Sequence, residues 1–265
     1  MSGRLKLRTL DMRSMTTTWK QWMDEARRLT LPRLVMAAAI CLAMAFGLSA
    51  CENVASFTQP SLVRVIDASY IAPAVNVVVE GIMLAGNIGE GTITPYATVP
   101  ASANALAKVT AATGGATLVS SNVTLLAGHQ HSVFLTDNGA APTSYTVTVL
   151  EDQQTAAPAG HSDFRFINEA PKVGALDIYM IPSGTTMANS IPLVTALPVG
   201  ATAAGYTRFA SQTVTMVIVP TGAIAPKYTS TAMALTGGEV RTVLIVDTQL
   251  TSNPPVAVYM ADDVN

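Results

Sequence analysis

The sequence predicts an all-β protein with two tandem antiparallel β-sandwich domains that follow an export segment. Three observations lead to this prediction. No segment after residue 60 shows a helical apolar period, short runs rich in Val, Ile and Thr recur between Gly, Pro, Asn and Ser, and the whole succession of runs occurs twice. Apolar residues with a period of two indicate a half-buried strand, whereas an amphipathic helix needs a period near 3.6.

The first repeat contains six candidate strands. In residues 75–80 (VNVVVE), Val75, Val77 and Val79 share one face, which is typical of a strand with one buried side. Turn formers lie between the runs, as in residues 113–115 (TGG) and 137–139 (DNG). The candidate strands are residues 62–66, 75–80, 106–111, 122–125, 130–136 and 146–150.

The second repeat matches the first at two offsets. Corresponding early segments of the two repeats are 101 positions apart, and corresponding later segments are 110 positions apart. The second repeat therefore contains nine extra residues between its early and later segments. Residues 181–192, which are rich in loop formers, are the predicted place of this insertion. The corresponding segments are 64–68 (RVIDA) and 165–169 (RFINE), 74–77 (AVNV) and 175–178 (ALDI), 95–96 (PY) and 205–206 (GY), and 134–137 (FLTD) and 244–247 (LIVD).

These repeats divide the chain into five predicted segments. Each repeat has the size of an ordinary domain, and six or seven short strands per repeat favour a sandwich over one continuous barrel. The segments are a signal peptide with an extended n-region (1–50), a lipidated tether (51–60), a first β-sandwich domain (61–152), a linker (153–160) and a second β-sandwich domain (161–265).

Composition excludes several classes of protein. The chain of 265 residues is 49% hydrophobic and only 12% charged, which excludes bulk disorder. Residues 1–50 carry a balance of +5 and the remainder −7, so the exported part has no basic surface for nucleic acid. Two cysteines exclude a disulfide framework and a four-cysteine zinc site.

The N-terminal segment has the features of a secretory signal. Three arginines precede an uncharged apolar run over residues 34–48, and the small residues Ser49 and Ala50 lead directly to Cys51. The run has fifteen residues, short for a bilayer core that needs roughly 20. The basic region before it is longer than usual, which leaves Met15 and Met23 open as later starts.

The junction resembles the lipobox of bacterial lipoproteins. That resemblance implies cleavage between Ala50 and Cys51 and acylation of Cys51, and the absence of an aspartate after the cysteine implies the outer membrane. Two or more acyl chains anchor a protein stably, so we expect a tethered exported body. The alternative is an uncleaved anchor with Cys51 as a buried thiol. Cys41 lies within the apolar run and would leave with the signal, so the exported fold would have no disulfide.

The opening of each repeat resembles the family called domain of unknown function 4397. Residues 64–81 (RVIDASYIAPAVNVVVEG) follow its pattern of Arg-Val-x-His/Asn-Ala-Ser-Pro and then Val-Asp-Val-Tyr-Val-x-Gly. The second copy has the residues of the family pattern at four positions where the first copy departs from it, namely Asn168, Pro171, Asp177 and Tyr179. The resemblance implies an exported, immunoglobulin-like β-sandwich without an established activity.

Two arginines are candidate structural residues. Arg64 and Arg165 begin their strands, and Asn76 and Asp177 follow them by twelve positions on the neighbouring strand. We expect a structural ion pair, or a guanidinium bonded to turn carbonyls, because arginine suits fixed multidentate contacts. An anion-binding site is the alternative.

Other polar groups suggest no chemistry. His129 and His131 share one strand face, but a metal needs three or four ligands, so we expect a solvated strand edge. The acidic pairs 151–152 and 262–263 each follow a final strand and are expected to be solvated strand ends, with calcium a minor alternative. No nucleophile elbow, phosphate loop or glycosidase carboxylate pair is present, so we expect no enzyme activity, no cofactor and no metal.

The sequence therefore favours a non-enzymatic lipoprotein of the cell envelope. Its expected role is that of a structural, adhesive or scaffolding binding module that contacts envelope proteins or surface polymers through loops or a strand edge. The alternative is a module that binds small ligands or carbohydrate, which a concave pocket lined by tyrosines would favour. The expected location is the outer membrane or the cell surface, where a lipid at Cys51 holds the chain.

Overall fold

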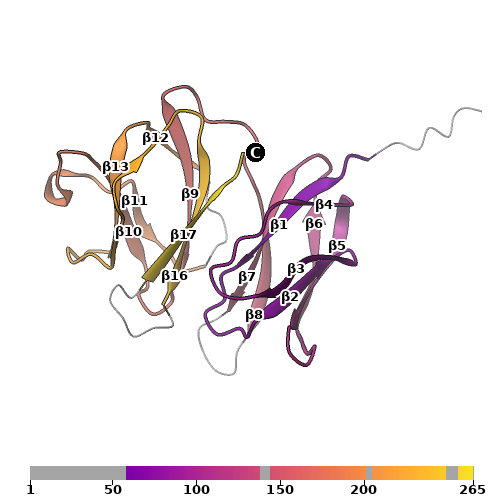
Figure 1. Cartoon of the computed structure of the whole chain (residues 1–265). Coiled ribbons are helices and arrows are strands. Elements are labelled where there is room, and N and C mark those ends of the chain that lie inside the picture. The colour runs from indigo at the N-terminus through magenta and orange to yellow at the C-terminus, as the bar shows by residue number, and fades with distance from the viewer. Residues whose placement is uncertain (1–57, 138–143, 201–204, 249–255, 265) are drawn as a thin grey trace, which may run out of the picture. The chain divides into compact units, whose positions relative to one another are not determined.

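The computed structural model describes residues 58–137, 144–200, 205–248 and 256–264, which form strands in four sheets (Figure 1). Residues Thr58–Asn265 form one compact unit. A single 3-10 turn, η2 (Met187–Asn189), interrupts the strands of the described residues, and the all-β prediction is confirmed. The predicted signal peptide and Cys51 lie outside the described residues.

The first repeat folds into sheets A and B, each with four strands. Sheet A contains, in order across the sheet, β4 (Ala97–Val99), β1 (Ser61–Asp67), β7 (Gln130–Asp137) and β8 (Tyr145–Glu151). Sheet B contains β3 (Ile82–Ile88), β2 (Val75–Val79), β5 (Ser102–Ala111) and β6 (Thr117–Leu125).

The second repeat folds into sheets C and D with the same order of elements. Sheet C contains β12 (Thr207–Ala210), β9 (His161–Glu169), β16 (Val240–Asp247) and β17 (Val256–Asp262). Sheet D contains β11 (Val194–Leu197), β10 (Leu176–Pro182), β13 (Thr213–Pro220) and β14 (Tyr228–Thr229), with β15 (Met233–Ala234) also paired to β13.

Each sandwich contains one parallel strand pair among its antiparallel ones. Strand β1 pairs with β7 in parallel, and β9 pairs with β16 in the same way. The registers correspond, because Arg64 lies beside Ser132 and Arg165 beside Thr242. The two repeats therefore place equivalent residues at equivalent points of sheets A and C.

Each sandwich has its own apolar core between its two sheets. In the first, Val63 and Val65 of β1 face the valines of β2, which are the alternating residues expected from the sequence. In the second, Phe164 and Phe166 of β9 take the positions of those two β1 residues. Burial of such side chains stabilises each sandwich by about 1.5–3 kcal/mol per large residue.

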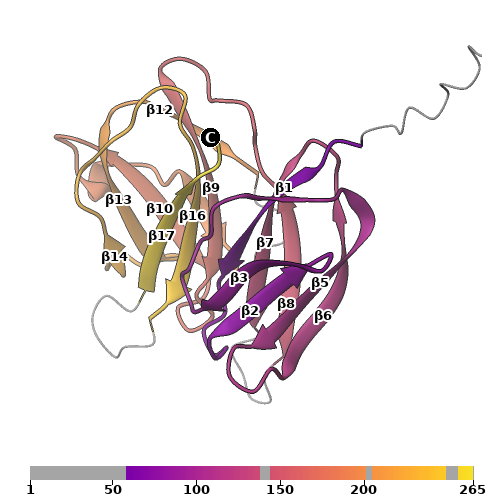
Figure 2. The same cartoon turned by 45° about the vertical axis from the view of Figure 1, so that its right-hand side comes forward.

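A third apolar cluster lies between the sandwiches. Ile66 and Phe134 of sheet A pack with Ile167 and Leu244 of sheet C, and all four are fully buried. Sheets A and C thus lie back to back between sheets B and D (Figures 1 and 2). Because sheets A and C pack on each other, their central strands β1, β7, β9 and β16 are buried on both faces. Strands of this kind have continuous apolar runs, as residues 243–246 (VLIV) of β16 show.

The six predicted strands of the first repeat are present, and two strands of that repeat were not predicted. The unpredicted β3 follows β2 through a two-residue turn at Glu80 and Gly81, whose φ angles are 49° and 78°. Two positive φ angles are typical of a type I′ hairpin, for which Asn-Gly is the usual signal. Glu-Gly does not carry that signal, and so the hairpin was missed. The short β4 was missed as well.

The regions predicted as insertion and linker are connections in the structure. Residues 183–193 join β10 to β11 and contain η2, whereas only Glu80 and Gly81 join β2 to β3. The linker packs against the second sandwich, since Ala157 is buried and its N–H donates to the carbonyl of Gly238 (3.2 Å). It therefore follows the sandwich surface and is not a free tether.

Residues 161–265 expressed alone are expected to fold but to self-associate. The fragment keeps the core of its own sandwich, yet it exposes the buried Arg165, Ile167 and Leu244 on the outer face of sheet C. Circular dichroism and light scattering test this, and Leu244→Gln is expected to weaken the association. A monomeric fragment with native strand content would contradict the stated role of this face.

Candidate functional site

The two predicted arginines lie in the interface between sheets A and C. Arg64 on β1 and Arg165 on β9 are 2% and 1% exposed. On β1, Val63 and Val65 face sheet B, so the alternation of the strand turns Arg64 toward sheet C. The expected contacts of the arginines with Asn76 and Asp177, which belong to sheets B and D, are therefore wrong.

Asn76 and Asp177 instead bind the edge strands of their own sheets. The Asn76 Oδ1 accepts the N–H of Asn87 (2.8 Å), a residue of β3 with a φ of 54°. The Asp177 Oδ1 accepts the N–H of Ala196 (2.8 Å), and this hydrogen bond lowers the pKa of Asp177. Ala196 has a φ of 51°, so in both sandwiches this position anchors a left-handed residue on the edge strand.

Arg64 crosses from the first sandwich to the second. Its Nη2 donates to the carboxylate of Asp263, and its Nη1 donates to the carbonyl of Asp262 (3.0 Å). Its Nε donates to Ser132 Oγ within its own sandwich (2.7 Å). The Arg64 guanidinium also lies 4.8 Å from the ring centroid of Tyr96, a cation–π distance.

Arg165 makes the equivalent contacts in the opposite direction. Its Nη2 donates to the carboxylate of Asp152, and its Nη1 donates to the carbonyl of Glu151 (3.1 Å), both in the first sandwich. Its Nε donates to Thr242 Oγ1 of its own sandwich (3.1 Å). Its guanidinium lies 5.0 Å from the ring centroid of Tyr206.

The acceptors are held by further hydrogen bonds. The Asp152 Oδ2 accepts from Ser132 Oγ and from Tyr96 Oη, each at 2.7 Å. Asp263 Oδ2 accepts from Thr242 Oγ1 (2.7 Å) and from the hydroxyl of Tyr206 (2.6 Å). We call this set the arginine–aspartate network; its members are Arg64, Tyr96, Ser132, Asp152, Arg165, Tyr206, Thr242 and Asp263.

Burial and charge act against each other within the arginine–aspartate network. Burial by itself lowers the pKa of Arg64, but the carboxylates of Asp263 and Asp152 raise it above its ordinary value. Burial and then the Asp152 carboxylate raise the pKa of Tyr96, so its hydroxyl remains a donor. The two arginines and two aspartates balance in charge, which removes the reason for an anionic ligand here.

The network corrects the expectation that both acidic pairs are solvated strand ends. Asp152 is 3% exposed and Asp263 is fully buried, although their neighbours Glu151 and Asp262 remain accessible. The sequence did contain a signal for them, because each acid ends its repeat at the same place. Tyr96 and Tyr206 also correspond between repeats, but their role was not predicted.

The two histidines separate in the structure. His129 is accessible, and its Nδ1 lies 2.6 Å from Glu151 Oε1. His131 is 2% exposed and its Nε2 accepts the N–H of Leu126 (3.3 Å), so the solvated edge predicted for it is wrong. Burial lowers the pKa of His131. Across the described ranges, no group of three or more His, Cys, Asp or Glu side chains is placed to hold a metal ion.

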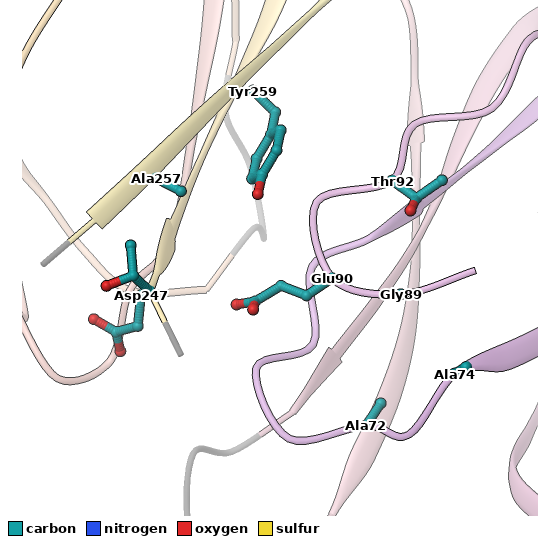
Figure 3. A pocket seen from close by; sticks show the side chains of 9 residues that line it. Ala72, Ala74, Gly89, Glu90, Thr92, Asp247, Ala257 and Tyr259 are labelled. Atoms are coloured by element: carbon teal, nitrogen blue, oxygen red, sulfur yellow. The ribbon is translucent and has the colours of Figure 1, made fainter. Parts of the chain in front are cut away.

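A cleft of about 540 Å³ lies where the two sandwiches meet (Figure 3). The side chains of Glu90 and Asp247 lie on opposite walls, and Tyr259 forms another part of the wall. The Glu90 carboxylate points into the cleft, whereas the buried Asp247 carboxylate turns away from it toward the Lys172 N–H. The Tyr259 ring lies where a side chain on Gly91 would be, since a Cβ there would approach the ring within 2.2 Å. Glycine at 91 avoids this clash and also adopts a φ of 78°, which other residues rarely do.

Asp137 and Asp247 hold equivalent loops at this end of the molecule. The Asp247 Oδ2 accepts the N–H of Lys172 (2.7 Å), and the Asp137 Oδ2 accepts the N–H of Ile71 (3.0 Å). Burial raises the pKa of Asp247, and the nearby Asp137 raises it further. The Lys172 ammonium donates to the hydroxyl of Tyr70, which joins the two loops.

Asp67 and Asn168 occupy equivalent positions with different chemistry. The Asp67 Oδ1 accepts the N–H of Ser69 (3.1 Å), and the Asn168 Oδ1 accepts the N–H of Ala170 (3.0 Å). Asn168 also donates its amide to two carbonyls, whereas the buried Asp67 Oδ2 has no hydrogen-bond partner among the described residues. Burial, reinforced by Asp137, raises the pKa of Asp67 to about 7.

We expect Asp67 to make stability fall as pH rises. Because its folded pKa lies above its ordinary value of 3.8, its contribution is fully present below about pH 4 and is lost as pH passes 7. The loss is at most about 4 kcal/mol. Asp67→Asn is expected to remove this dependence and to stabilise the chain at pH 8, as urea unfolding from pH 4 to 8 would measure.

The difference between the variant and the natural chain isolates this effect. His131, whose pKa is lowered by burial, gives a pH dependence of opposite sign below about 6.5 in both proteins. Asn168→Asp is the matched control and is expected to destabilise, because it removes two donated hydrogen bonds. Equal pH dependence of Asp67→Asn and the natural chain would contradict a protonated Asp67.

No helix within the described residues is both long and apolar enough to cross a membrane.

No curated protein matches the chain. One similar solved structure is the family 26 carbohydrate-binding module of Amy13K from Eubacterium rectale, in complex with maltoheptaose, at 11% identity and a TM-score of 0.23. The alignment covers 76% of this chain and 96% of that one, and such a score carries no information on function. Residues 61–179 match the model of the family described as Domain of unknown function (DUF4397), which supports the family resemblance of the first repeat.

Proposed function

We propose that the chain is a non-enzymatic lipoprotein of the cell envelope whose two sandwiches act as one rigid structural, adhesive or scaffolding binding module. The observation that carries this proposal is the arginine–aspartate network. Its two arginines, two aspartates and two tyrosines all bind one another and the strands that carry them. The arginines and aspartates of the network are buried, and their ion pairs join the two sandwiches.

The proposed attachment rests on the export segment. A basic region, a fifteen-residue apolar run and the Ala50-Cys51 junction support cleavage and acylation at Cys51. Two or more acyl chains would hold the module stably at the outer membrane or cell surface. Strand edges and loops would then face envelope proteins or surface polymers.

Labelled palmitate tests the attachment. The natural chain and Cys41→Ala are expected to incorporate the label and to fractionate with membranes, because Cys41 lies within the segment that is removed. Cys51→Ala is expected to lose the label and membrane association. Incorporation that survives Cys51→Ala would refute the lipid anchor.

Photo-crosslinking in living cells tests the binding role. Crosslinking residues at Ile191 and Ile224, which are 89% and 85% exposed on loops of the second sandwich, are expected to capture envelope components. The same substitution at the buried Met216 is the control for non-specific capture. Absence of any loop- or edge-specific product, with the chain folded in the envelope, would count against the module.

The cleft of Figure 3 favours one second candidate, a module that binds small ligands or carbohydrate. Its volume lies within the usual range of ligand sites, and Tyr259 with the Glu90 carboxylate offers an aromatic face and a hydrogen-bond acceptor. Calorimetry with maltose, cellulose and chitin oligosaccharides tests this candidate. Tyr259→Ala should abolish any binding and Met260→Ala should not, because Met260 lies outside the cleft.

A further inference from the structure

Strand β6 forms an open edge of sheet B. Sheet B ends at β6, and β5 is the strand that pairs with it. Its nine residues make it the longest edge strand among the described sheets, and its sequence TLVSSNVTL contains no charge and no proline. Natural sheets protect such edges with charge, proline, bulges or short length.

The equivalent edge of the second sandwich is protected. There, the place of β6 is taken by β14 (Tyr228–Thr229) and β15 (Met233–Ala234), two strands of two residues each. Pro226 and Lys227 precede this interrupted edge. The repeats therefore differ at this point, although they agree in the strands of the interface between sheets A and C.

The sequence of β6 is complementary to itself in an antiparallel arrangement. A two-fold axis at Ser121 places Val119 opposite Val123 of a second copy, Ser120 opposite Asn122, and Ser121 opposite itself. The register with β5 is regular from Val119 to Val123, and irregularities of the β5–β6 pairing lie only outside this stretch. No opposed pair brings like charges together.

Burial also favours this arrangement. Val119 and Val123 pack against the core of the first sandwich but are only partly buried. The axis pairs odd-numbered residues with odd-numbered ones and even with even, so paired side chains lie on the same face of the sheet. Valine therefore meets valine on the face toward the core. Pairing would extend the core and satisfy the backbone groups that point away from β5.

We propose that β6 is a self-association edge that joins two copies of this chain as an antiparallel pair and makes one eight-stranded sheet from two copies of sheet B. This goes beyond the proposed binding function, because the pairing needs no other partner. The two-fold axis closes the assembly at a dimer, since each copy uses the same patch.

The test uses the full chain purified in detergent with its own N-terminal segment. Ser121→Cys is expected to form a covalent dimer on mild oxidation with copper phenanthroline, because opposed residues lie about 4.5–5.5 Å apart, within disulfide range. Thr124→Cys is the matched control, since the two copies of residue 124 would lie six positions apart, about 20 Å. The natural chain controls for Cys41 and Cys51.

Light scattering gives the second measurement. The natural chain is expected to be dimeric, and Asn122→Lys is expected to weaken dimerisation about tenfold or more by placing two lysines on one face of the pair. A monomeric natural chain would overturn the proposal. A dimer that Asn122→Lys leaves intact, or equal crosslinking at residues 121 and 124, would overturn it as well.

Discussion

Asp263→Ala is expected to lower the free energy of unfolding by about 3–5 kcal/mol, because it leaves the buried Arg64 guanidinium without its charged partner. The Tyr206 and Thr242 hydroxyls lose an acceptor in the same step. Urea unfolding followed by circular dichroism measures the loss. Asp152→Ala is expected to have a similar effect through Arg165, because the network is reciprocal.

The neighbouring Asp262 provides the matched control. Its side chain is 70% exposed and pairs with Arg241 at 3.2 Å, so Asp262→Ala is expected to cost less than about 1 kcal/mol. The double variant Arg64→Met with Asp263→Leu is expected to recover much of the loss, because paired apolar groups need no charge compensation. Equal effects of the two single aspartate variants would contradict a buried network.

Phe134→Ala is expected to cost about 3–5 kcal/mol, as large-to-small changes in well-packed cores do. Phe134 is fully buried in the apolar cluster between sheets A and C, where Ile66 and Leu244 contact it. Thermal and urea unfolding measure the loss. The result tests whether the two sandwiches are stabilised by their shared interface as well as by their own cores.

Leu106→Ala is the control for this prediction. Leu106 lies on β5 of the same sandwich but is 49% exposed, so its truncation is expected to change stability by no more than about 0.5 kcal/mol. A loss below about 1 kcal/mol for Phe134→Ala would contradict close packing of sheets A and C.

Local patterns were sufficient for the predicted strands. The alternating valines of β2 and the apolar run of β7 each specify an extended segment, and turn formers separate them. The offsets of 101 and 110 also predicted which strands correspond and where the second repeat has its longer connection. The hairpin at Glu80 was missed, because its turn conformation depends on context and not on a strong local preference.

The partners of the arginines could not be predicted in this way. Arg64 is twelve positions from Asn76 but 199 from Asp263, and only the packing of sheet A on sheet C brings the last pair together. Alternation shows that Arg64 faces away from Val63 and Val65, but not what covers that face. The same reasoning explains why Asp152 and His131 were expected in solvent and are buried.

The sequence by itself determined the all-β class, the two repeats and six of the eight strands of the first repeat, because these follow from hydrophobic period and turn chemistry within a few residues. Only the tertiary structure decided that sheets A and C are buried on both faces, that each arginine pairs with the aspartate of the other sandwich, and that a cleft lies beside Tyr259. These features depend on which surfaces meet, and burial between distant segments cannot be read from the period of a single strand.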